Sequence, residues 1–156
     1  PLSAVATTQE IAHSLVGAGL TISTFGGNPV SCAAAIGTLE EMKREWGPER
    51  SAKIGSRLET GLITLKEKYP LIGEVRGRGL MQAVDLVTDQ ESKTPASKHA
   101  NALLNTARQA GLLIGKGGLH GNAMRIAPPL VAAEEHVDEA LEKLDLALSK
   151  VQEMTL

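Results

Sequence analysis

Residues 23–29 read Ser-Thr-Phe-Gly-Gly-Asn-Pro, and a run of small residues, Val-Ser-Cys-Ala-Ala-Ala, follows at positions 30–35. A helix start offers backbone N–H groups and a partial positive charge. Glycines let an anion approach the backbone, asparagine caps a helix, and proline fits the first helical position. This order predicts a loop and helix start that bind a phosphate or carboxylate. An ordinary glycine-rich turn before a helix fits the same residues equally well.

The composition is typical of a globular chain. Of its 156 residues, 42% are hydrophobic and 22% are charged, which is enough for a real core. A net charge of -2 and only three aromatic residues argue against a nucleic-acid partner. We expect no membrane span and no signal peptide. The single cysteine, Cys32, excludes an internal disulfide, so we expect a reducing compartment and a cytoplasmic location.

Apolar periodicity predicts five helices and a small sheet. The helices are expected at about 8–16, 29–46, 49–68 and 96–110, with a final helix from about 133. Short strands are expected at 2–6, 81–87, 112–114 and 124–127, and a turn-rich loop at 115–122. Strands covered by helices on one side predict an α/β protein with an α+β layer. The boundary is expected near the Trp46-Gly47-Pro48 segment.

Three blocks in this order resemble the class-III pyridoxal-phosphate (PLP) aminotransferases of fold type I. The first is residues 23–29. The second, residues 73–81, reads Gly-Glu-Val-Arg-Gly-Arg-Gly-Leu-Met, and the third, residues 124–130, reads Met-Arg-Ile-Ala-Pro-Pro-Leu. Residues 111–118 favour the alanine–glyoxylate aminotransferase 2-like branch. The resemblance implies that residues 1–46 are the end of the large PLP-binding domain with a connecting helix. Residues 47–156 would then be the C-terminal small domain.

The resemblance also assigns cofactor roles to the first block. Thr24 matches the threonine that binds the phosphate of PLP held mainly by the other subunit of a homodimer with shared active sites. Ser23, Gly26 and Gly27 belong to the same cofactor-binding loop, and the glycines would let it reach the phosphate. Asn28 is interpreted as a helix cap rather than a ligand.

Arg125 matches the family's arginine that binds the α-carboxylate of the substrate. A guanidinium offers paired, planar donors that fit a carboxylate, although a solvent-facing strand arginine is the alternative. Arg76 and Arg78 are expected to pair with the backbone or with carboxylates. His120 is expected at a surface or at the mouth of the substrate site. No metal site is expected, because no second histidine or cysteine stands at ligand spacing.

The catalytic lysine of the family has no counterpart in this chain. The lysine that forms a Schiff base with PLP lies, in the family, shortly before the segment matching residues 1–5, and no lysine here precedes Lys43. We therefore expect a fragment of a longer enzyme that is inactive alone. The parent would move an amino group from an amine or amino acid to a 2-oxo acid such as pyruvate or glyoxylate. A class-III decarboxylase, an aminomutase and a non-catalytic dimerisation module remain alternatives.

Overall fold

The computed structural model describes residues 2–19 and 23–154. The chain divides into two compact units, Pro1–Glu45 and Trp46–Leu156. Each unit is described by itself below.

The first unit contains two helices, α1 (Gln9–Gly17) and α2 (Pro29–Arg44). Asn28 caps α2: its side-chain oxygen accepts hydrogen bonds from the backbone N–H groups of Val30 and Ser31, both at 3.1 Å. Proline at the first position needs no such partner. The interpretation of Asn28 as a cap is confirmed.

The strand expected at 2–6 is wrong. These residues have no regular structure and pair with no strand among the residues that the structure describes. A strand needs a neighbour for its backbone groups, and Val5 is 91% exposed. The apolar character of this segment therefore does not mark a strand of this unit.

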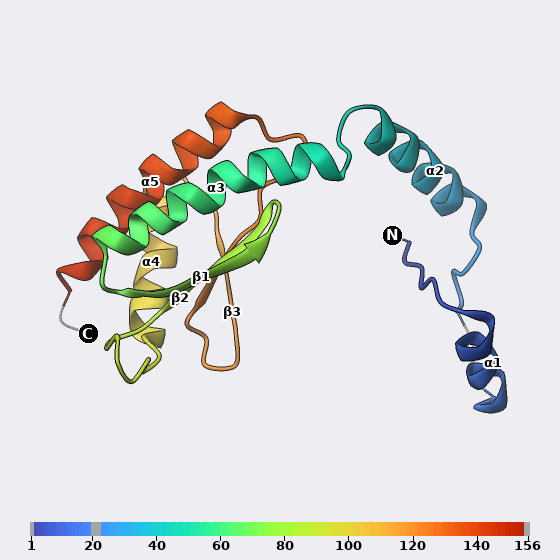
Figure 1. Ribbon diagram of the computed structural model, residues 1–156, viewed down its shortest axis with the longest axis horizontal. Helices are drawn as coiled ribbons and strands as arrows, with labels where there is room; N and C mark the ends of the chain where they lie inside the picture. The colour runs from blue at the N-terminus through green and yellow to red at the C-terminus, as the bar shows by residue number, and fades with distance from the viewer. Residues whose placement is uncertain (1, 20–22, 155–156) are drawn as a thin grey trace. The chain divides into compact units, whose positions relative to one another are not determined.

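The second unit packs three helices against a four-stranded sheet (Figure 1). Its helices are α3 (Pro48–Lys68), α4 (Ser97–Gln109) and α5 (Glu134–Gln152). Its strands are β1 (Ile72–Arg78), β2 (Met81–Leu86), β3 (Gly115–Gly117) and β4 (Ala123–Ile126). The spatial order is β1-β2-β4-β3, and all neighbours are antiparallel. The predicted combination of helices with a small sheet is confirmed.

One face of this sheet carries the core. The apolar stripe of α3 packs with α5, which lies beside it in Figure 1, and with strands β1 and β2, and buried side chains of β4 belong to the same core. Fully buried members include Leu58, Leu62, Val84, Met124 and Leu148. Alternation along β2 and β4 places the other side chains of these strands, Ala83, Asp85 and Arg125 among them, on the opposite face. That open face is where functional side chains can reach a ligand.

Two strand predictions need correction. Residues 112–114, predicted as a strand, are irregular, and the strand is instead β3, inside the segment predicted as a loop. The Gly-Lys-Gly sequence of β3 has no apolar pattern, and its pairing with β4 is what makes it a strand. Strand β1 was not predicted, because its two glycines and two arginines interrupt any alternation.

Among the described helices, none combines the length and the apolarity needed to cross a bilayer.

Candidate functional site

The first group of predicted site residues forms one turn before α2. Ser23 leads into a turn over residues 24–27. The Gly26 N–H donates to the Ser23 carbonyl at 3.2 Å, and the Asn28 N–H donates to the Phe25 carbonyl at 3.2 Å. The turn thus brings Ser23, Thr24, Gly26 and Gly27 together, and all four are exposed.

The two glycines are required for different reasons. Gly27 has φ of +72°, a conformation that other residues rarely adopt. A Cβ on Gly26 would lie 2.9 Å from both the Cβ and the Oγ of Ser23. Substituting either glycine would therefore change the path of the turn.

The start of α2 offers fewer donors to an anion than predicted. Pro29 has no N–H, and the next two N–H groups already donate to the Asn28 side chain. The Cys32 N–H donates to the Asn28 carbonyl at 2.9 Å. These helix-start N–H groups therefore already have partners within the turn, and anion binding by the loop stays a prediction. Among the described residues, neither the Thr24 hydroxyl nor the Ser23 hydroxyl makes a hydrogen bond, so both are side-chain donors that this turn presents to a ligand.

Arg125 lies in the second unit, on strand β4. Met124 and Ile126 on either side of it are buried in the core, whereas Arg125 is exposed on the open face. Strand β4 pairs with β2 on one side and β3 on the other, and Arg125 lies opposite Ala83 and Gly115. Both neighbours have little or no side chain, so the guanidinium has room above the sheet. No ion pair to Arg125 is found in the described part of the chain.

Arg76 pairs with a carboxylate on the same open face. Its Nη2 lies 2.9 Å from Asp85 Oδ1, and its Nε lies 3.2 Å from Asp85 Oδ2. This agrees with the expectation of a carboxylate partner for Arg76. Arg78 is exposed at the end of β1, and His120 is exposed in the β3–β4 connection. Asp85 itself was missed, although the alternation of buried and less buried residues along β2 would have placed it on this face.

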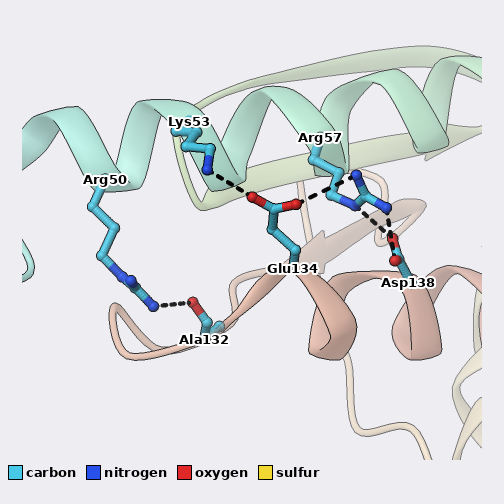
Figure 2. A network of polar contacts seen from close by, with 6 residues as sticks. All are labelled: Arg50, Lys53, Arg57, Ala132, Glu134 and Asp138. Carbon is cyan, nitrogen blue, oxygen red and sulfur yellow. Dashed lines mark hydrogen bonds and ion pairs between the residues drawn. The ribbon is translucent and has the colours of Figure 1, made fainter.

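A cluster of polar contacts joins two helices of the second unit. Figure 2 shows Arg50, Lys53 and Arg57 of α3 reaching toward the start of α5. Arg57 Nε lies 2.6 Å from Asp138 Oδ1, and this hydrogen bond lowers the pKa of Asp138. Lys53 Nζ lies 2.8 Å from Glu134 Oε1 and likewise lowers the pKa of Glu134.

These carboxylates also occupy the first turns of α5, where negative charge is favoured. The cluster therefore fastens α5 to α3, and it lies away from the open face of the sheet. None of its residues was a predicted site residue.

Comparisons with known proteins identify the family. The family model "Aminotransferase class-III" matches residues 1–148. Alanine–glyoxylate aminotransferase 2 homolog 2, mitochondrial, of Arabidopsis thaliana is 44% identical over 97% of this chain and 31% of its own length. A leucine/methionine racemase of Thermococcus litoralis is 42% identical over 98% of this chain and 34% of its own length.

A solved structure shows the same relationship. The amine transaminase of an uncultivated Pseudomonas species, in its PLP-bound form, superposes with a TM-score of 0.77 at 32% identity, covering 92% of this chain and 31% of that one. The chain therefore spans about a third of the length of these relatives. Its structural neighbours are PLP-dependent aminotransferases of fold type I. The chain belongs to the class-III aminotransferase family.

Proposed function

We propose that this chain forms the C-terminal portion of a PLP-dependent aminotransferase that moves an amino group from an amine or amino acid to a 2-oxo acid. Family membership supports the reaction class, and the exposed Arg125, free of an ion pair among the described residues, supports a carboxylate-bearing substrate. Residues 1–46 would be the end of the large domain with its connecting helix, and residues 47–156 the small domain.

The turn before α2 fits a phosphate through a restricted set of donors. Because Asn28 already binds the N–H groups of Val30 and Ser31, the phosphate of PLP would be held by the Thr24 hydroxyl. Ser23, Gly26 and Gly27 shape the turn that presents it. When bound, PLP supplies an aldehyde that accepts an amino group from one substrate and gives it to another. In a homodimer with shared active sites, this turn would serve the partner subunit's cofactor.

Arg125 would bind and orient the substrate through its carboxylate. Two parallel N–H···O bonds from a guanidinium are stronger than neutral hydrogen bonds and also fix the orientation of the carboxylate. The small neighbours Ala83 and Gly115 leave space for such a ligand above β4. The lysine that handles the proton would come from a part of the enzyme outside this chain, so these residues alone would not catalyse transfer.

Product analysis tests the reaction class. In the enzyme that contains this chain, a 15N-labelled amino donor and pyruvate are expected to yield labelled alanine and the oxo form of the donor. Release of carbon dioxide, migration of the amino group within one molecule, or racemisation without transfer would contradict the proposal. The first two outcomes would identify a decarboxylase or an aminomutase. Absence of turnover with every amine tested would favour a non-catalytic dimerisation module.

The role of Thr24 has its own test. Thr24→Ala is expected to weaken PLP binding about tenfold, since a hydrogen bond to a charged group is lost, whereas Thr24→Ser retains the hydroxyl and serves as the matched control. The dissociation constant is measured by titrating cofactor-free enzyme with PLP. Equal constants for the two variants would contradict the assignment.

The location and substrates of the enzyme are also proposals. The single cysteine fits a reducing compartment such as the cytoplasm, while the Arabidopsis relative is named as mitochondrial. Pyruvate and glyoxylate are the acceptors proposed from the family branch.

A further inference from the structure

A row of opposed residues crosses the open face of the sheet. Arg76 on β1 lies opposite Ala83 on β2, and Ala83 lies opposite Arg125 on β4. The two arginines thus flank the same alanine from opposite sides. Neighbouring strands are about 4.8 Å apart, so both guanidiniums can sample the space above β2.

Asp85 stands at a position that both arginines can reach. It is two residues along β2 from Ala83 and lies opposite Glu74 on β1 and Ala123 on β4. It is therefore a diagonal neighbour of Arg76 on one side and of Arg125 on the other. Diagonal neighbours on one face are roughly 7–8 Å apart, within reach of a long side chain.

The structure contains only one of these two possible pairs. Asp85 accepts hydrogen bonds from Arg76, with Nη2 2.9 Å from Oδ1 and 3.1 Å from Oδ2. Arg125 instead lies toward β3, where a Cβ built on Gly115 would be 3.2 Å from its Nε and 3.4 Å from its Nη2. Glycine at 115 thus lets the guanidinium lie there, away from Asp85.

We propose that Arg76 is a positioning residue: by holding Asp85, it keeps Arg125 free to bind the carboxylate of the substrate. The inference rests on the proposed role of Arg125. Without Arg76, the Asp85 carboxylate would compete with the substrate for the Arg125 guanidinium. The opposing Glu74 increases this competition, because two neighbouring carboxylates attract a cation more strongly than one.

Other cations near this face have different partners. Lys93 lines the same pocket as Glu74 and Asp85, but its Nζ donates to Gln90 Oε1 at 2.7 Å and to the Gly73 carbonyl at 3.4 Å. Arg78 lies opposite Met81, four residues from Asp85 along β2. Arg125 is therefore the cation best placed to take Asp85 when Arg76 is removed.

A double-variant cycle tests the proposal in the enzyme that contains this chain. Arg76→Gln is expected to raise the KM for pyruvate about threefold with little change in kcat, the size expected for competition from one exposed ion pair. Adding Asp85→Asn removes the competing carboxylate and is expected to return KM to the wild-type value. Arg78→Gln, on the same strand and face, is the matched control and is expected to leave KM unchanged.

Binding without turnover gives a second measurement. In cofactor-free protein, propionate is titrated while the Arg125 Nε–H signal is followed by NMR, and neutral propionamide is the control ligand. Arg76→Gln is expected to weaken propionate binding about threefold, and the double variant is expected to restore it. Propionamide binding is expected to be the same in every variant.

The outcomes separate this inference from the proposed function. A wild-type KM in Arg76→Gln, or a double variant that stays as weak as the single one, would overturn the positioning role. If Arg125→Gln raises KM while Arg76→Gln does not, the carboxylate site stands and only the inference fails. If Arg125→Gln leaves KM unchanged, both are overturned.

Discussion

Thr24 and Arg125 are placed by two different kinds of structure. Thr24 lies in a turn held by local hydrogen bonds and by the cap of α2. Arg125 lies on a strand bonded on both sides, with buried neighbours packed against three helices. The difference shows that a local sequence pattern can build a turn, whereas the placement of a side chain on a sheet depends on pairing between distant segments.

The largest expected difference between the two units is in the energetics of their helices. Leu62 on α3 is completely buried, while Leu39 on α2 is 57% exposed. Leu62→Ala is expected to lower the free energy of unfolding by about 2–5 kcal/mol, and Leu39→Ala by less than about 0.5 kcal/mol. Urea unfolding followed by circular dichroism measures both. A loss of about 2 kcal/mol or more in the free energy of unfolding for Leu39→Ala would show that α2 and α3 depend equally on these side chains.

Glycines in α3 and α2 allow a second comparison of the two helices. A Cβ on Gly55 of α3 would lie 2.2 Å from the carbonyl carbon of Gly79, whereas a Cβ on Gly37 of α2 would meet no described atom within 4 Å. Gly55→Ala is expected to cost about 1–3 kcal/mol, while Gly37→Ala is expected to gain about 0.5–1 kcal/mol from helix propensity. Thermal unfolding of both variants tests this, and equal shifts of Tm would refute it.

Loss of the α2 cap is expected to have a smaller effect. Asn28→Ala removes the acceptor for two backbone N–H groups and is expected to cost about 1 kcal/mol, seen as reduced helicity and stability. Asn28→Ser, which keeps an oxygen acceptor, is the control.

Because Arg125 is exposed and makes no ion pair among the described residues, Arg125→Ala is expected to change stability by less than about 0.5 kcal/mol. The reverse order of these effects would contradict the distinction between cap and ligand residue.

A further small effect concerns the dependence of stability on pH. Lys68 and Tyr69 both donate hydrogen bonds to Asp145, and these bonds lower the pKa of its carboxyl in the folded state. A lowered pKa stabilises the fold above the unfolded value of about 3.9, and this contribution disappears as the pH falls through the folded value.

Urea unfolding at pH 3 to 7 checks this assignment. Asp145→Asn is expected to be less stable than wild type by under about 1 kcal/mol at pH 7, with the gap closing at the acid end. A gap that stays constant with pH would assign the loss to packing rather than charge.

Local sequence patterns predict the helices well and the sheet only in part. The spacing of Ile54, Leu58, Leu62 and Leu65 predicts α3, and all four are buried. Strand β3 has no pattern of its own and depends on pairing with β4. Strand β1 has no continuous alternation, since Gly73 and Gly77 interrupt it.

The candidate site likewise contains one residue whose role a local pattern predicts and others whose roles it does not. Asn28 as a cap follows from residue type and position alone. The roles of Thr24 and Arg125 rest on resemblance to a family, because neither residue type nor spacing specifies a phosphate or a substrate. The Arg76–Asp85 pair depends on the register of β1 against β2, which no local pattern specifies.

The carboxylate-binding role of Arg125 is tested most directly by comparing kcat/KM for pyruvate in wild-type enzyme, Arg125→Ala and Arg108→Ala. Arg108 is an exposed arginine on α4 and serves as the matched control. Because a paired, charge-assisted interaction is lost, kcat/KM is expected to fall about 10- to 100-fold in Arg125→Ala through a rise in KM. Arg108→Ala is expected to leave kcat/KM unchanged. An unchanged KM in Arg125→Ala would contradict the account.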